Sequence, residues 1–304
     1  MRKWSDFPQD NLDRSVRRWL QEVLLKNVGA GSSEERECRG IADRLMAGID
    51  DRSRTVLEMV GRRYDESELN RLGVWLDQVL DGAPVQHAVG WTEFRGLRIL
   101  CSPKALIPRP ETEEVVEWFL EGMAAGLAEG SSDEPVRVMD VGTGTGCIAL
   151  AIKAARPHWE VWGVDVSEAA LALARQNGRE LGLDVNWLRG DMLKGTGEGG
   201  PITVHGIVSN PPYIPEAEAV DMEPHVRDRE PHLALFVPDS DPLCFHRALL
   251  QHAEIRVGVG GCVVAECHPK FTRSVADCWQ LEGAETEVLI DLQGAERAVR
   301  MVRH

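Results

Sequence analysis

Apolar side chains recur at helical spacing through the N-terminal quarter of the chain. Leu69, Leu72 and Leu76, for example, fall on one face of a helix. A Gly-Ala-Gly-Ser-Ser segment at residues 29–33 separates one helical series from the next. The pattern predicts a small helical domain over residues 1–82. It carries no catalytic motif and is expected to serve in substrate recognition or in packing.

The periodicity changes in the next segment. Phe94, Leu97 and Ile99 lie in an alternating pattern around Gly96, which is typical of two short strands joined by a turn. We therefore expect a β-hairpin linker over residues 83–104, joining two domains.

Further along, short apolar runs alternate with amphipathic stretches. This alternation predicts an α/β catalytic domain over residues 105–304, built on a mostly parallel, doubly wound sheet. The last two expected strands are too close in sequence for a parallel crossover, so they should pair antiparallel. The expected strands lie near residues 136–141, 160–165, 185–189, 204–209, 261–266, 285–291 and 297–303, and the expected helices near 111–127, 146–156, 168–182, 241–256 and 269–282.

The charge of the chain restricts its partners. The 304 residues include 49 acidic and 34 basic side chains, for a net charge of −15. Residues 1–80 are close to neutral, so most of this negative charge lies in the expected catalytic domain. Such a body binds phosphate backbones poorly and suits a basic protein partner. We expect no stable nucleic-acid binding.

Cysteine usage and the N-terminus indicate a cytoplasmic protein. The seven cysteines are odd in number and form no Cys-x-x-Cys, which is typical of reduced thiols. Cys262, Cys267 and His268 lie close in sequence but are too few and too irregularly spaced for a metal site, so we expect no metal. Residues 1–6 lack the apolar core of a signal peptide, and no apolar stretch approaches membrane-spanning length. We expect no membrane association.

A glycine-rich turn follows the first expected strand of the catalytic domain. Asp140-Val-Gly-Thr-Gly-Thr-Gly146 leads from that strand into a helix, which is typical of a site for a nucleotide-bearing cofactor. Asp165 ends the next expected strand and can accept both hydroxyls of a ribose. The carboxylate of Asp140 would repel a pyrophosphate but not a cationic amino group or a sulfonium. The pattern therefore favours S-adenosyl-L-methionine over NAD.

The tetrapeptide Asn210-Pro211-Pro212-Tyr213 follows the expected strand 204–209. Two consecutive prolines fix φ and remove two backbone donors, so the corner is rigid and presents an amide, bare carbonyl groups and an aromatic ring. It can bind a planar –NH2 group, with the Asn210 oxygen and a prolyl carbonyl accepting the two hydrogens. The alternative is a proline-rich turn without chemistry.

These segments are expected to meet at one place. In an open α/β sheet, ligands bind outside the carboxyl ends of the strands. The glycine-rich loop, Asp165, Asp191 and Asn210 all follow expected strands. We therefore expect them to converge on one edge of the sheet.

With these motifs, the chain resembles the protein-(glutamine-N5) methyltransferases of the HemK type, which modify peptide-chain release factors. Asn-Pro-Pro-Tyr alone is shared with DNA adenine methyltransferases, so the segments before the glycine-rich loop carry the distinction. The resemblance spans residues 84–304, more loosely the helical N-terminus, and rests on Pro84 to Leu97, Leu106 to Glu113, Asp140 to Gly146 and Asn210 to Ile214.

The resemblance implies a seven-stranded Rossmann-like methyltransferase sheet, S-adenosyl-L-methionine as methyl donor, and the glutamine of a Gly-Gly-Gln loop as acceptor. It places Asp165 at the ribose and Asp191 and Met192 near the adenine. Some relatives have an aromatic residue in place of Met192, although a thioether also packs well on rings. The residues implied at the methionine moiety are Gly142, Thr143, Gly144, Thr145 and Gly146.

The resemblance leaves two local points open. Arg109 and Glu111 belong either to a lid over the cofactor or to the start and ion pairs of the following helix. Residues 266–270, Glu-Cys-His-Pro-Lys, depart from relatives that usually carry a glycine and a later glutamine.

For the reaction, we expect the Asn210 oxygen and the Pro211 carbonyl to accept the two hydrogens of the glutamine amide, with Tyr213 packed against its plane. One alternative is a methyltransferase for a glutamine of a ribosomal protein, since the corner would be the same. A second is a nucleic-acid amino-methyltransferase acting on a flipped base, which the acidic charge disfavours. A third is a cofactor-binding protein with a decayed site, which the intact corner disfavours.

Overall fold

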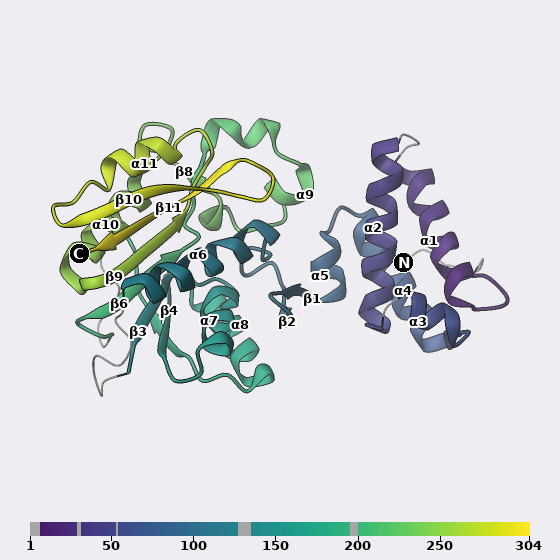
Figure 1. Cartoon of the computed structure of the whole chain (residues 1–304). Helices are drawn as coiled ribbons and strands as arrows, with labels where there is room; N and C mark the ends of the chain where they lie inside the picture. The colour runs from purple at the N-terminus through teal and green to yellow at the C-terminus, as the bar shows by residue number, and fades with distance from the viewer. Residues whose placement is uncertain (1–6, 29–31, 53, 127–134, 195–199) are drawn as a thin grey trace. The chain divides into compact units, whose positions relative to one another are not determined.

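The computed structural model describes residues 7–28, 32–52, 54–126, 135–194 and 200–304 (Figure 1). The chain divides into two compact units. The first contains Met1–Trp91 and also Pro224–Arg229, and the second contains Thr92–Glu223 and Glu230–His304. A short segment from late in the chain therefore belongs to the N-terminal unit, which the periodicity of the sequence did not indicate.

The first unit is helical. Its helices pack through the apolar faces that the sequence predicts, and Val16, Leu20, Leu45, Leu72 and Leu76 are fully buried. The helices are α1 (Asp13–Val28), α2 (Ser32–Ile49), α3 (Arg54–Met59), α4 (Glu66–Leu80), α5 (Val85–Val89) and α9 (Pro224–Arg227). The expected break at 29–33 falls partly outside the described residues.

The hairpin is shorter than predicted. Strands β1 (Trp91–Phe94) and β2 (Leu97–Leu100) pair in a two-stranded sheet around Arg95 and Gly96, whose φ angles of 47° and 74° suit a tight two-residue turn. The residues before them form helix α5, so a hairpin over all of 83–104 is wrong. Pro84 precedes this helix and Gly90 ends it, a combination that favours a short helix over a strand.

The second unit is built on a seven-stranded sheet in the order β10-β11-β9-β6-β3-β4-β5. β3 lies near the centre and pairs parallel with β4 and β6. β11 pairs antiparallel with both β9 and β10, which confirms the predicted antiparallel end. The strands are β3 (Arg137–Val141), β4 (Glu160–Asp165), β5 (Asn186–Arg189), β6 (Val204–Ser209), β9 (Val257–Glu266), β10 (Ala284–Ile290) and β11 (Glu296–Arg303).

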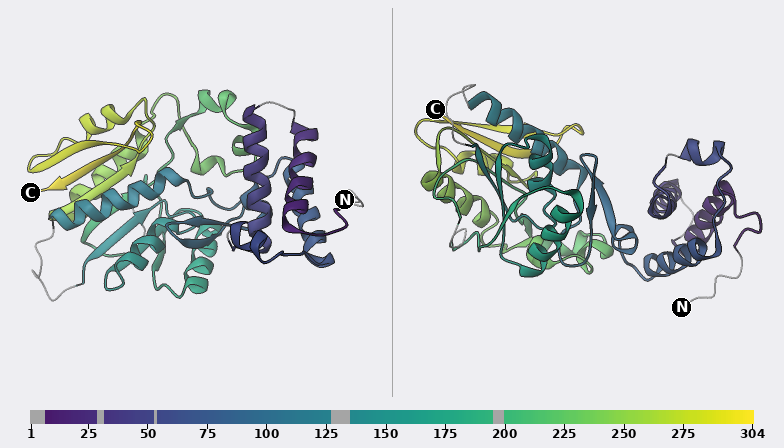
Figure 2. Two further views of the ribbon diagram at one scale, coloured as in Figure 1. Left: turned by 45° about the vertical axis from the view of Figure 1, so that its right-hand side comes forward. Right: turned by 90° about the horizontal axis from the view of Figure 1, so that it is seen from below.

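Helices cover both faces of this sheet. α6 (Pro110–Gly126), α7 (Cys147–Ala155) and α8 (Glu168–Leu181) pack on one face, and α10 (Cys244–Arg256) and α11 (Thr272–Cys278) on the other. Figure 2 shows α6 running along the sheet. This arrangement confirms the predicted doubly wound α/β class.

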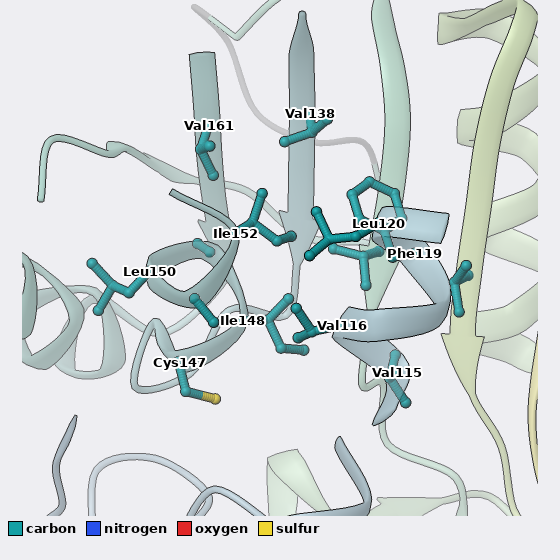
Figure 3. Close-up of a cluster of buried hydrophobic side chains, with 14 of the residues drawn as sticks. Val115, Val116, Phe119, Leu120, Val138, Cys147, Ile148, Leu150, Ile152 and Val161 are labelled. Atoms are coloured by element: carbon teal, nitrogen blue, oxygen red, sulfur yellow. The ribbon is translucent and has the colours of Figure 1, made fainter. Parts of the chain in front are cut away.

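Two apolar clusters hold the layers together. Figure 3 shows side chains of α6 and α7, among them Val116, Phe119 and Ile148, gathered beside Val138 of β3. On the opposite face, Trp279 is fully buried among residues of α10, β9 and β11. Each large apolar side chain that is buried in this way stabilises the fold by about 1.5–3 kcal/mol.

The connection from β6 to α10 contains short elements that the sequence did not predict. β7 (Ile214–Pro215) pairs parallel with β8 (Phe236–Val237). Between them lie the 3-10 helices η1 (Glu216–Asp221) and η2 (His232–Ala234), together with α9 of the first unit. Across the described ranges, no helix combines the length and apolarity required to span a membrane.

Candidate active site

The site lies where the strand order reverses. The chain passes from β3 outward to β4 and β5 and then returns to β6 on the opposite side of β3. This reversal opens a crevice outside the carboxyl ends of β3 and β6. Ser209 Oγ donates a hydrogen bond of 2.6 Å to the carbonyl oxygen of Val141, which holds the two strand ends together.

A cavity of about 250 Å³ occupies this crevice. Its wall combines the glycine-rich loop with the carboxyl ends of β4, β5 and β6, as the sequence predicted for one edge of the sheet. Its other walls come from the segments before α6 and around η2. The lining residues include Arg109, Thr112, Gly142, Thr143, Gly144, Thr145, Asp165, Asp191, Met192, Asn210 and Pro212.

The glycine-rich loop presents bare backbone to the cavity. Gly142, Gly144 and Gly146 have φ angles of 78°, 55° and 83°, a conformation that glycine adopts readily and other residues rarely. A Cβ at Gly146 would lie 2.7 Å from the ring of Trp187. The tight turn therefore requires glycine. Residues 142–145 line the cavity, where a ligand can approach their main chain, whereas Gly146 is not among the lining residues.

Asp140 supports this loop from behind. Its Oδ2 accepts hydrogen bonds from Thr143 Oγ1 at 2.5 Å and from the Ala149 amide at 3.2 Å. Oδ1 is buried and has no partner within the described part of the chain. Burial raises the pKa of this carboxyl to about 7. A cationic group bound beside the loop would stabilise the ionised carboxylate, whereas a phosphate would oppose it.

Asp165 and Asp191 form the wall beyond the loop. Asp165 accepts hydrogen bonds from the amides of Gly144, at 2.9 Å, and Ser167, at 2.8 Å. Each oxygen keeps a second lone pair for a ligand hydroxyl, and burial raises the pKa of the carboxyl. Asp191 accepts from the Leu193 amide at 3.0 Å. Met192 is buried with its side chain at the cavity.

The Asn-Pro-Pro-Tyr corner is only partly at the cavity. Asn210 and Pro212 line it, whereas Pro211 and Tyr213 are not among its lining residues. Asn210 Nδ2 donates to Thr112 Oγ1 at 3.0 Å. Tyr213 Oη donates to Glu266 Oε1 at 3.0 Å, and burial raises the pKa of the phenol well above its usual value.

Arg109 both lines the cavity and forms an ion pair, which leaves its role at the cofactor a prediction. It lines the cavity, and its Nη2 forms an ion pair of 2.5 Å with Glu230 Oε1. The other oxygen of Glu230, whose side chain is completely buried, accepts from the Ile107 amide at 2.9 Å. Glu230 thus ties the segment before α6 to the segment around η2. Glu111 is not among the lining residues.

Three residues that contribute to the site could not be given a role from the sequence. They are Thr112, Glu230 and Glu266. Their partners lie far away in the chain, 154 residues in the case of Thr112 and Glu266. A weak signal was present, since Glu266 ends an apolar run that forms a buried strand. A carboxylate at the carboxyl end of such a strand is a candidate for the site edge.

No group of three or more His, Cys, Asp or Glu side chains is placed to hold a metal ion in the part of the chain that the structure describes. The glycine-rich loop, the cavity-lining carboxylate of Asp165 and the unpartnered Oδ1 of Asp140 fit a nucleoside that carries a cationic group. These three features are independent of the Asn-Pro-Pro-Tyr corner.

Comparison with known proteins gives consistent matches. The methyltransferase small domain family matches residues 126–224. The release factor glutamine methyltransferase of Deinococcus radiodurans is 41% identical over 220 residues, covering 72% of this chain and 74% of that protein. The same enzyme of Chlorobaculum tepidum is 35% identical over 289 residues, covering 92% and 96%. The solved structure of TrmN from Thermus thermophilus matches with 20% identity and a TM-score of 0.43, covering 62% and 48%.

Proposed function

Because the chain belongs to the release factor glutamine methyltransferase family, we propose that it methylates the N5 amide of the Gly-Gly-Gln glutamine of a peptide-chain release factor, with S-adenosyl-L-methionine as donor. The observation that carries this proposal is the position of Asn210. Its side-chain amide stands at the cavity beside the glycine-rich loop, with its nitrogen bonded to Thr112. Its oxygen is thereby left to accept from an incoming –NH2 group.

The residues that would hold the cofactor follow from the cavity wall. Gly142 to Thr145 would surround the methionine part, Asp165 would accept the ribose hydroxyls, and Asp191 and Met192 would flank the adenine. Arg109 would close the wall from the opposite side. When bound, S-adenosyl-L-methionine supplies an electrophilic methyl group on a sulfonium that leaves as a neutral thioether.

The enzyme residues would act by orienting the acceptor. A glutamine amide nitrogen is a weak nucleophile, because its lone pair is delocalised into the carbonyl. Asn210 Oδ1 would accept one of its hydrogens and hold the nitrogen toward the methyl group. The Pro211 carbonyl, proposed to accept the other hydrogen, belongs to a residue outside the cavity lining. Transfer would form an N–CH3 bond on the acceptor as the S–CH3 bond breaks, and the extra proton on nitrogen would leave to solvent. The two acceptors favour the positive charge that develops on nitrogen.

The position of Tyr213 differs from the one expected from the sequence. The sequence suggested a ring packed on the amide plane, but the phenol is anchored to Glu266 and is not among the lining residues. We propose that Tyr213 supports the corner through its hydrogen bond to Glu266 and does not itself contact the acceptor amide.

The proposal is tested by incubating the enzyme with labelled S-adenosyl-L-methionine and, separately, a release factor, a ribosomal-protein fraction and DNA. The modified residue is then mapped by mass spectrometry. One methyl group on the Gly-Gly-Gln glutamine is expected. Label found only in ribosomal protein or only in DNA would contradict the acceptor.

The role of Asn210 is tested in the same assay. Asn210→Ala should lower kcat by about 100-fold or more, since it removes an acceptor made for the transition state. The dissociation constant of the cofactor should change little. Wild-type turnover in this variant would contradict the assignment.

A further inference from the structure

A chain of hydrogen bonds runs through side chains from separate parts of the second unit. Glu266, the last residue of β9, is only 1% exposed. Its Oε2 accepts from Thr112 Oγ1 at 2.7 Å, and its Oε1 accepts from Tyr213 Oη at 3.0 Å. Thr112, in the first turn of α6, in turn accepts from Asn210 Nδ2 at 3.0 Å. The chain therefore ends on the residue expected to bind the acceptor amide.

The direction of these bonds follows from the ionised form of Glu266. A threonine hydroxyl has one proton, and an ionised carboxylate can only accept. The Thr112 proton is therefore committed to Glu266, and Thr112 faces Asn210 with a lone pair. The Asn210 group at that position must be the NH2, because an oxygen there would have no proton to bind. The network itself fixes the orientation of the amide.

We propose that Glu266 and Thr112 are positioning residues for methyl transfer, which hold the Asn210 side chain with its oxygen toward the acceptor nitrogen. This inference rests on the proposed function. If the Asn210 side-chain amide were flipped by about 180°, its NH2 group would face the NH2 group of the substrate glutamine. No oxygen of Asn210 would then be available to accept a hydrogen bond from the substrate.

A carboxylate suits this position better than any other side chain. Only an ionised carboxylate accepts at both ends, so it makes the hydroxyls of Thr112 and Tyr213 both donate. A glutamine would accept at one end and donate at the other, and an apolar residue would do neither. Burial raises the pKa of the Glu266 carboxyl, whereas Thr112, Tyr213 and the charge of Arg297 lower it and Glu111 raises it. Burying a carboxylate costs desolvation free energy. The proposed role in orienting Asn210 gives a reason for a carboxylate at this position.

Two substitutions of the same residue separate orientation from packing. Thr112→Val keeps the shape of the side chain but removes the hydroxyl, and Thr112→Ser keeps the hydroxyl. We expect Thr112→Val to lower kcat on a release factor by about tenfold or more, with the dissociation constant of S-adenosyl-L-methionine within about twofold. Thr112→Ser should recover most of the rate.

Thr272→Val is the matched control, since it removes another buried threonine hydroxyl, one that donates to the His268 carbonyl at 3.1 Å. It should lower stability without changing kcat. Three results would overturn the proposal. They are a Thr112→Val rate within about twofold of wild type, an equal loss of rate in Thr112→Ser, or a loss confined to cofactor affinity.

A second measurement does not depend on the acceptor. In protein labelled with 15N-asparagine, the Asn210 side-chain NH2 is identified by its disappearance in Asn210→Asp. One of its two protons should exchange slowly with solvent in the wild type, because Thr112 holds it, and quickly in Thr112→Val. Equal exchange in both proteins would overturn the inference even where a release factor is methylated. Slow exchange with no methylation would instead contradict the proposed function alone.

Discussion

Buried carboxylates in the second unit differ in how their surroundings shift their pKa. Asp140 and Glu266 are raised in pKa by burial, whereas Asp291, which accepts from Ala295 N and Arg297, is lowered in pKa by its hydrogen bonds. The same side chain therefore contributes to stability with opposite pH dependence in two places. A pair of matched substitutions can reveal this difference.

Asp140→Asn should remove part of the pH dependence of folding. The folded pKa of about 7 lies above the ordinary aspartate value of 3.8, so between about pH 4 and pH 7 the folded state binds more protons than the unfolded state. Stability then falls as pH rises through this window, by up to about 1.4 kcal/mol per pH unit. Urea unfolding at pH 5 and pH 8 should show that the free energy of unfolding of the variant, relative to that of the wild type, is higher at pH 8 than at pH 5.

Asp291→Asn is the opposite control. The lowered pKa of Asp291 gives stability that is present near neutral pH and lost as pH falls through that pKa. This variant should therefore lose most at pH 8 and least in acid. Parallel pH profiles for wild type and Asp140→Asn would contradict the assignment of the buried charge.

Arg109 and Glu111 can be separated by single substitutions. Arg109→Ala removes the charged partner of the buried Glu230 and keeps its bond from the Ile107 amide, which should cost about 1–3 kcal/mol of stability. It should also weaken cofactor binding, because two walls of the cavity lose their link. Glu111 lies in the same segment but does not line the cavity. Glu111→Ala should therefore change neither stability nor cofactor affinity, as measured by unfolding and by calorimetric binding. Equal effects of the two substitutions would show that the lid assignment is wrong.

Helices and strands could be predicted from the sequence where a hydrophobic pattern within a short segment marks them. The strands of the large sheet are found within a few residues of their predicted places, because each combines an apolar run with flanking polar residues. β9 starts at Val257 rather than 261, and α11 ends at Cys278 rather than 282. β7 and β8 were missed because two residues carry no periodicity. They exist only through pairing such as Ile214 N to Leu235 O.

The site residues also divide into those that a local pattern predicts and those that depend on long-range contacts. Asn210, Asp165 and the glycine-rich loop could be placed at the cavity from sequence, because each directly follows a strand of the sheet. The position of Tyr213 and the roles of Thr112 and Glu266 could not. Their hydrogen bonds join segments that only the folded sheet and α6 bring together.

The turn from β3 into α7 offers a prediction for a single element. Gly146 and Gly182 have similar φ angles of 83° and 65°, but an added Cβ meets Trp187 at 2.7 Å in the first case and nothing within 4 Å in the second. Gly182→Ala should therefore cost only the conformational strain of about 1–2 kcal/mol. Gly146→Ala should cost a further amount of about 1–3 kcal/mol from overpacking. Denaturant unfolding compares them directly, and equal losses would contradict the steric account of the loop.

At the scale of the whole molecule, charge is unevenly spread between the two units. The net charge is −15, and residues 1–80 contribute almost none of it. A helical unit close to neutral and an acidic catalytic unit are suited to different parts of a protein acceptor. Electrostatic attraction of a basic acceptor to the acidic unit would act mainly on the rate of encounter.

Salt should therefore weaken the reaction with a release factor through the acceptor and not through the cofactor. Raising the ionic strength from about 0.05 M to about 0.3 M shortens the screening length to well under 10 Å. The KM for a basic release factor should then rise several-fold, because long-range attraction is screened. The KM for S-adenosyl-L-methionine should stay nearly constant, since that ligand is bound in a cavity by short-range contacts. Steady-state rates with each substrate varied in turn provide the measurement. An acceptor KM that is indifferent to salt would show that the negative charge serves solubility rather than recognition, and a parallel rise in both KM values would point to a general effect on the fold.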